Sequence, residues 1–324
     1  MAERSGDTAF RPAGGFQKRR GAPLPAAVQK KLLRRQPRWI SSVSIRVHPW
    51  LNASVETLKF KLTIAYDGTG YEGWQVQKTG TGVQEIVETA LAKLFPSKPR
   101  LHSASRTDTG VHALGMVAHF EIPAVESKMS TRRLALAINA WLPEDIRVLS
   151  AARTSKEFHA RFDAAGKQYR YFVWNHTAMN PLLRHSAWQV TRSLNLKAMR
   201  AAASLFVGRR DFKSFAASRN YEMKSTVRRL TRCDIKKSGP KLTFIIEGDG
   251  FLYKMCRGIV GTLVQIGLGK FPADEIKRML AKKDRRVAGM TAPAYGLVLW
   301  KVFYTVLPAS RRKNKSAGRM PAAR

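Results

Sequence analysis

The chain has 324 residues, 58 of them Lys or Arg and 22 of them Asp or Glu, so its formal net charge is +36. Apolar residues make up 44% of the chain and charged residues 25%, which are ordinary globular values and argue against a wholly disordered protein. No apolar run is long enough to span a membrane, and two cysteines are too few for a disulfide framework, so we expect a cytoplasmic protein with no membrane partner.

The positive charge favours a polyanionic partner. A net charge of +36 lies far above the magnitude of about 2 to 8 that is usual for a small soluble domain. Residues 1–55 carry a net +9 and residues 307–324 a net +6, which leaves +21 for residues 56–306. Nucleic acid is therefore the first expectation, ahead of an anionic membrane surface and of a charge that only keeps the protein soluble.

Both ends of the chain have the composition of tails. Residues 1–55 form a basic extension that we expect to be disordered, because its first thirty residues mix Gly, Pro, Ala and Arg without apolar periodicity. This segment lacks the apolar core of a secretory signal, and its early Glu3 and Asp7 argue against an organelle transit peptide. We interpret it as an RNA-binding arm, with a functionless extension as the alternative, and residues 307–324 as a basic C-terminal tail.

Between the tails, two successive stretches have the same order of elements. Strands are predicted by alternation, as in Leu58, Phe60 and Leu62, and helices by apolar residues at helical spacing. In the first stretch the predicted elements are strand 58–64, turn 67–70, helix 82–95, strand 100–103, strand 116–122, helix 134–140 and strand 146–149. In the second they are strand 168–174, helix 199–207, a hairpin of 229–237 and 241–247, helix 255–266, a short helix 273–281 and strand 296–304.

Each stretch follows the order β-α-β-β-α-β, which is typical of a ferredoxin-like unit. We therefore predict an α+β protein with an N-terminal catalytic half at 56–155 and a C-terminal half at 156–306. Each half has a mixed or antiparallel sheet with helices on one face. By analogy with other sheets of this type, the exposed sheet faces or the groove between the halves could hold RNA, and we expect the cleft between the halves to be the RNA site.

The polar segment 103–115 joins two predicted strands and is the candidate site of chemistry. It carries Arg106, Asp108 and His112 within seven residues. Asp108 is suited to act as a nucleophile or a general base. Arg106 is suited to keep that carboxylate ionised or to bind a phosphate in a bidentate way. Without further information, a surface turn in which Arg106 pairs with Asp108 explains the same residues.

Neither metal nor cofactor chemistry has a sequence motif here. The seven histidines show no zinc-ligand spacing, and the glycines near Gly68 match no phosphate-binding loop. We therefore expect no metal and no cofactor.

Residues 105–113, Ser-Arg-Thr-Asp-Thr-Gly-Val-His-Ala, resemble the active-site motif of the TruA-type tRNA pseudouridine synthases. The resemblance spans about residues 56–306. Ser105 and Thr109 replace the more common glycine and alanine, within the range of the family. Further segments similar to family motifs occur, in the order of the family, at 65–75, 139–146, 158–162, 167–171, 211–215, 251–261 and 292–297.

The resemblance implies an enzyme that detaches uracil from its ribose and rejoins it through carbon 5, without a cofactor. Asp108 matches the catalytic aspartate, acting as a nucleophile or, in an alternative scheme, by removing a proton. Tyr169 matches a tyrosine that contacts the target base. Arg257 matches an arginine that pairs with the aspartate, a role that Arg106 could share. Arg161, Lys167 and Arg170 are candidate RNA contacts.

The resemblance also implies the substrate and the assembly. We expect modification of uridines 38–40 in the anticodon stem-loop of tRNA by a homodimer. One alternative is a pseudouridine synthase that acts on more positions or on other RNAs. Others are an RNA-binding module without catalysis and a metal-dependent nuclease, although the carboxylate cluster of a nuclease is not found.

Overall fold

The first strand of the described residues coincides with the first clear alternation of the sequence. The computed structural model describes residues 56–77, 80–217 and 225–305. The predictions made for residues 1–55 and 307–324 lie outside these residues. The elements of the first stretch are β1 (Thr57–Tyr66), α2 (Val83–Leu94), β2 (His102–Ser103), β3 (His112–Pro123), α3 (Thr131–Asn139) and β4 (Ile146–Thr154).

The second stretch holds all of the predicted elements and two short strands that were not predicted, β6 and β7. Its elements are β5 (Ala164–Trp174), β6 (Trp188–Gln189), α4 (Leu196–Ser204), β7 (Gly208–Asp211), β8 (Val227–Ser238), β9 (Lys241–Gly248), α5 (Met255–Gly267), α6 (Glu275–Lys282) and β10 (Leu297–Tyr304). The short strands lack a long alternating pattern, so periodicity could not find them.

The strands form one sheet, whereas the sequence predicted a separate sheet in each half. Within the described part of the chain, eight strands run in the order β4-β1-β3-β10-β5-β9-β8-β7, and β2 pairs with β3 and β6 with β5. The join is a short parallel pairing in which His112 and Ala113 of β3 face Val298 and Leu299 of β10. Each strand would otherwise leave backbone hydrogen-bonding groups unpaired at a sheet edge, and pairing satisfies them. The other strands that are adjacent in this order pair antiparallel.

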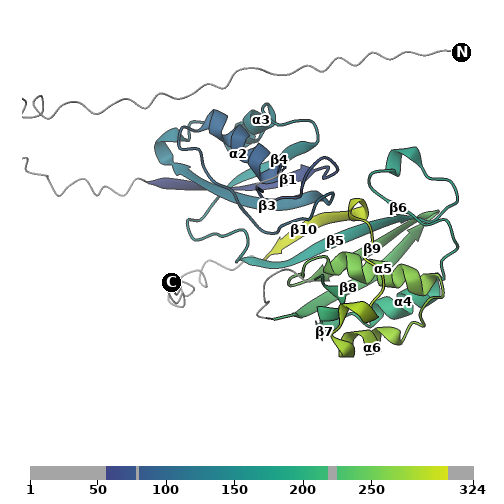
Figure 1. Cartoon of the computed structure of the whole chain (residues 1–324). Helices are drawn as coiled ribbons and strands as arrows, with labels where there is room; N and C mark the ends of the chain where they lie inside the picture. Colours follow the sequence, from purple (N-terminus) through teal and green to yellow (C-terminus); the bar gives the residue numbers. More distant parts are fainter. Residues whose placement is uncertain (1–55, 78–79, 218–224, 306–324) are drawn as a thin grey trace, which may run out of the picture. The chain divides into compact units, whose positions relative to one another are not determined.

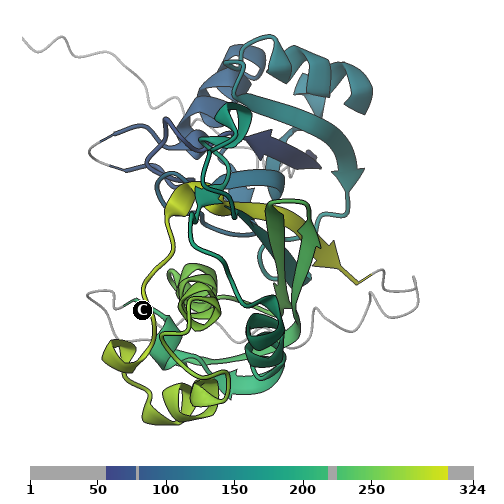
Figure 2. The ribbon, with the colours of Figure 1, turned by 90° about the vertical axis from the view of Figure 1, so that its right-hand side faces the viewer.

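The helices gather in two groups, one along each part of the sheet. In both views α2 and α3 lie together near β1 and β4, while α4, α5 and α6 lie together near β7 and β8 (Figures 1 and 2). Val87 and Leu91 of α2, like Ile259 and Leu263 of α5, are fully buried in the apolar core. Within the described residues, no helix combines the length and apolar character needed to cross a membrane.

Candidate active site

Asp108 lies in the short connection between β2 and β3, in a tight turn. The Val111 N–H donates to the Asp108 carbonyl over 3.1 Å, and Gly110 takes a positive φ of 73°. That backbone conformation favours glycine. The turn therefore holds Asp108 at the end of a rigid strand, where loop residues commonly carry function.

The segment that follows β1 holds this loop in place. Tyr66 Oη and Thr107 Oγ1 share a buried hydrogen bond of 2.7 Å, and the backbone N–H of Trp74 donates to the Thr107 carbonyl over 3.2 Å. A Cβ atom on Gly73 would lie 2.4 Å from that same carbonyl, and a Cβ atom on Gly68 would lie 2.2 Å from the Val111 carbonyl. Only glycine allows this close approach of the two backbones. The sequence around them had predicted a turn and not this contact.

Arg257 approaches Asp108 from the second half of the chain. Its Nη1 lies 3.8 Å from Asp108 Oδ2, and the two side chains are only 14% and 20% exposed. Arg257 Nε donates to the Ala292 carbonyl over 2.7 Å, and the Ala292 N–H donates back to the Arg257 carbonyl. The guanidinium is thus oriented before any ligand binds. Arg106 is exposed and lines the cleft beside Asp108.

His112 connects the same loop to the second half. Its Nδ1 accepts from the Gly68 N–H over 3.0 Å, and its Nε2 lies 2.8 Å from the Tyr295 carbonyl. Nδ1 also lies 3.0 Å from Asp67 Oδ1. His112 is buried and begins β3. Its contacts therefore join the turn after β1 to the segment that leads into β10. His112 therefore helps to hold the loop in position.

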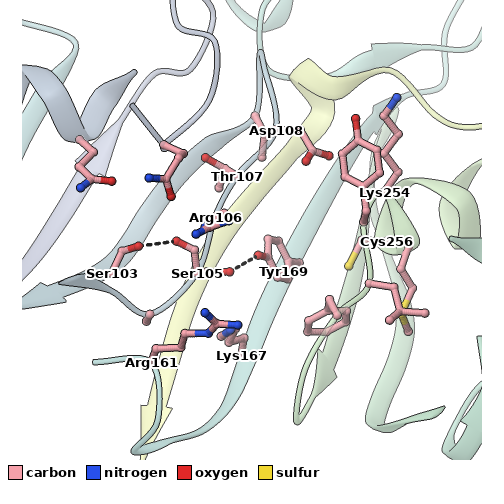
Figure 3. A pocket seen from close by; sticks show the side chains of 18 of the residues that line it. Ser103, Ser105, Arg106, Thr107, Asp108, Arg161, Lys167, Tyr169, Lys254 and Cys256 are labelled. Carbon is pink, nitrogen blue, oxygen red and sulfur yellow. Dashed lines mark hydrogen bonds between the residues drawn. The ribbon is translucent and has the colours of Figure 1, made fainter. Parts of the chain in front are cut away.

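Tyr169 stands on β5 across from the loop (Figure 3). Its hydroxyl shares a 3.1 Å hydrogen bond with Ser105 Oγ, and its ring meets Phe251 edge-on at 5.0 Å between centroids. Burial, followed by the neighbouring Cys256 thiol, raises the pKa of Tyr169, so the phenol stays neutral at physiological pH. The site therefore holds a neutral aromatic ring beside a carboxylate.

Arg106, Asp108 and Tyr169 line one cleft of about 990 Å³ that draws residues from both halves of the chain. Among the described residues that line it, Asp108 is the one acid, and the cations are Arg100, Arg106, Arg161, Lys167, Arg228 and Lys254. A cleft with this charge favours a polyanion and can hold several phosphates. Among the described residues, no group of three His, Cys, Asp or Glu side chains could hold a metal ion.

Comparison with known proteins matches the sequence of this chain to a family. The family model for tRNA pseudouridine synthase matches residues 62–163 and 202–305. The chain belongs to the tRNA pseudouridine synthase family. A protein of Acetivibrio thermocellus named tRNA pseudouridine synthase A is 44% identical over 244 residues, which are 75% of this chain and 98% of that protein. A protein of the same name from Geobacter sp. strain M21 is 45% identical over 245 residues, with the same coverage.

Among the expected site residues of this tRNA pseudouridine synthase, the structure brings five into the cleft, while Arg257 is not a lining residue and lies 3.8 Å from Asp108. Arg170 is not among the cleft residues. It lies on β5 between Tyr169 and Tyr171, and its guanidinium stacks 3.8 Å from the Trp300 ring centroid. Successive side chains of a strand point to opposite faces, so Lys167 and Tyr169 share one face and Arg170 takes the other. The five in the cleft are Arg106, Asp108, Arg161, Lys167 and Tyr169.

Sequence reasoning missed several cleft residues of this synthase. Arg100, Arg228 and Lys254 are single cations in a chain that has 58 of them, and nothing in their local pattern sets them apart. Lys254 has one detectable peculiarity, a positive φ of 58° directly before α5, which no sequence pattern predicts. Phe162 belonged to a segment similar to a family motif but was not assigned a role.

Lys167 leads to a prediction about pH. Burial, followed by the nearby Arg161 and Arg228, lowers the pKa of Lys167 to about 8. The side chain is therefore largely charged at pH 7 and largely neutral at pH 9, and a bound phosphate favours the charged form. We expect RNA affinity to fall by up to about tenfold over this range from the loss of one charged phosphate contact.

Filter binding at fixed ionic strength measures this effect. Lys167→Arg is the matched variant, because a guanidinium stays charged throughout the range. We expect its affinity to change much less with pH than that of the wild type. The same pH dependence in both proteins would contradict the assignment of the effect to Lys167.

Proposed function

We propose that this protein converts uridine to pseudouridine at positions 38–40 in the anticodon arm of tRNA, with Asp108 as the nucleophile. The observation that carries the proposal is that Asp108, which lines a cationic cleft together with Tyr169, pairs with Arg257. Membership of the tRNA pseudouridine synthase family supports the reaction and the class of RNA.

The proposed reaction balances without a co-reactant. The bond between C1′ and N1 breaks, uracil turns, and a bond forms between C1′ and C5. C5 loses a proton and N1 gains one, so substrate and product are isomers. The Asp108 carboxylate attacks C1′ as the bond to N1 breaks, and its own bond to C1′ breaks when C5 attacks, which releases the carboxylate. The Arg257 cation favours the charged form of that carboxylate.

The base must leave the RNA stack before its glycosidic bond becomes accessible. In the proposed complex the target uracil stacks on Tyr169, whose ring lines the cleft near Asp108. Arg106, exposed at the same place, and the cleft cations Arg161 and Lys167 bind the RNA backbone. Arg170 is retained as a candidate RNA contact outside the cleft.

The same proposal covers the organisation of the chain. Residues 56–155 and 156–306 are two ferredoxin-like halves with helices on one face of each, and the RNA cleft lies between them. The order of β4, β1, β3 and β2 repeats in β10, β5, β9 and β8, which supports this division. We further propose a cytoplasmic homodimer, with residues 1–55 and 307–324 as basic extensions of the folded core.

The test is to incubate the purified full chain with uridine-labelled, unmodified tRNA, without added metal or ATP. We expect labelled pseudouridine, and mapping by a pseudouridine-specific chemical stop places it at 38–40. Conversion at other positions would overturn the anticodon-arm assignment and leave the reaction intact. Tight binding without any conversion would overturn the reaction and favour an RNA-binding module.

A further inference from the structure

The cleft presents an exposed aromatic ring that the reaction does not use. Phe162 lines the cleft, yet its side chain is 65% exposed. Single exposed apolar residues are common and need no explanation by themselves. Phe162 differs because its ring is part of an ordered group of rings and lies among cations.

The ring rests on a histidine. The centroids of Phe162 and His159 are 4.3 Å apart with the planes tilted by 33°, and His159 meets His119 edge-on at 4.7 Å. His119 in turn stacks on His102 at 5.1 Å. Burial, with His159, Lys59 and His102 nearby, lowers the pKa of His119 to about 4, so this buried ring is neutral at pH 7. Phe162 is therefore the exposed end of a packed row of rings.

Hydrogen bonds fix the turn that carries Phe162. His159 Nδ1 accepts from the N–H groups of Arg161 and Phe162 over 3.2 and 3.4 Å. The His159 N–H donates to Asp163 Oδ2 over 2.8 Å, and the Asp163 N–H donates to the His159 carbonyl over 3.0 Å. A ring held in this way loses little conformational freedom when a ligand stacks on it, so more of the stacking energy contributes to affinity.

The surrounding charges favour a nucleotide as that ligand. The Arg161 guanidinium lies 5.7 Å from the centroid of the Phe162 ring, and Figure 3 shows Arg161 and Lys167 reaching toward one another inside the cleft. Arg228 lines the same cleft and is close enough to Lys167 to lower its pKa. An aromatic face beside clustered cations suits a base and its phosphates.

We propose that Phe162, supported by His159, stacks on a nucleobase next to the target uridine, and that Arg161, Lys167 and Arg228 bind the adjoining phosphates. This is a second nucleotide subsite, separate from the position of the target base at Tyr169. The inference rests on the proposed function, because it takes RNA to be the occupant of the cleft.

The test compares Phe162→Trp, Phe162→Leu and Phe162→Ala, each combined with Asp108→Asn so that the tRNA is bound and not converted. A stacking contact of ordinary strength predicts about tenfold weaker binding for Ala. Leu is apolar but has no aromatic face, so we expect it to resemble Ala, whereas Trp binds as well as Phe. Trp141→Ala is the matched control, since Trp141 is 57% exposed with Lys93 5.9 Å from its ring centroid and lies outside the cleft lining.

Two further readouts separate stacking from other effects. Lys167→Met should lower the salt dependence of binding by about one phosphate contact, while the Phe162 variants leave it unchanged. In an anticodon-arm hairpin with 2-aminopurine beside the target uridine, emission should fall on binding and should not fall with Phe162→Ala. Equal tRNA affinity for Phe and Ala, or for Phe and Leu, would overturn the stacking role. Absence of pseudouridine from the wild-type chain would instead overturn the proposed function, and the binding series would still decide the role of Phe162.

Discussion

We expect Asp108→Asn to lower the rate of pseudouridine formation on the order of 10⁴-fold or more. The amide has the shape of the carboxylate but is a poor nucleophile and no base. Binding of tRNA should remain, because the change removes a negative charge from the lining of a cationic cleft. Single-turnover conversion of labelled tRNA measures the rate, and filter binding measures the affinity.

Asp234→Asn is the matched control for this experiment. Asp234 also faces an arginine, with Oδ2 3.1 Å from Arg232 Nη2, but it lies on β8 and not in the cleft lining. We expect wild-type conversion from it. Substantial conversion by Asp108→Asn would exclude Asp108 as the nucleophile. A primary isotope effect from deuterium at the ribose C2′ would favour the proton-removing scheme over nucleophilic attack.

Arg257→Gln should give the second largest effect, about a 100-fold loss of the rate of conversion with a smaller change in tRNA affinity. The variant removes the cation 3.8 Å from the Asp108 carboxylate, where both side chains are largely buried. Because that cation favours the charged carboxylate, the acid limb of the pH–rate profile should also move to higher pH. Rapid-quench conversion across pH measures both changes.

Two variants show whether charge or structure is responsible. Arg257→Lys keeps the charge but loses the Nε–H that bonds the Ala292 carbonyl, so we expect an intermediate rate. Arg286→Gln removes an arginine from an exposed 2.7 Å ion pair with Asp284 and should leave the rate unchanged. If Arg257→Gln kept the acid limb of the wild type and only lowered the melting temperature, Arg257 would be structural.

The long elements were predictable because each has a complete local signal. Leu58, Phe60 and Leu62 alternate in β1, and the hairpin of β8 and β9 was predicted on both sides of its turn at Gly239. The apolar row that includes Ile259 and Leu263 predicted α5. The strands β6 and β7 are two and four residues long, too short for a periodic signal, and they form against neighbouring strands.

In the candidate site, too, some features had a local sequence signal and others had none. The loop around Asp108 was predictable because its residues are contiguous and resemble a family motif. The partnership with Arg257 depended on that resemblance, since 149 positions separate the two residues and no local pattern connects them. Arg228 had neither signal, and Phe162 lay in a segment similar to a family motif but was given no role, so their presence in the cleft emerged only from the folded chain.

The sequence by itself determined the basic character of the protein, the repeated order of strands and helices, and the loop that carries Asp108. Each of these depends on neighbouring residues or on the sum of the charges. Only the tertiary structure decided that the two halves share one sheet through β3 and β10, and which cations line the cleft. Pairing of sheet edges and convergence of side chains from distant elements depend on contacts across the chain, which periodicity and composition do not encode.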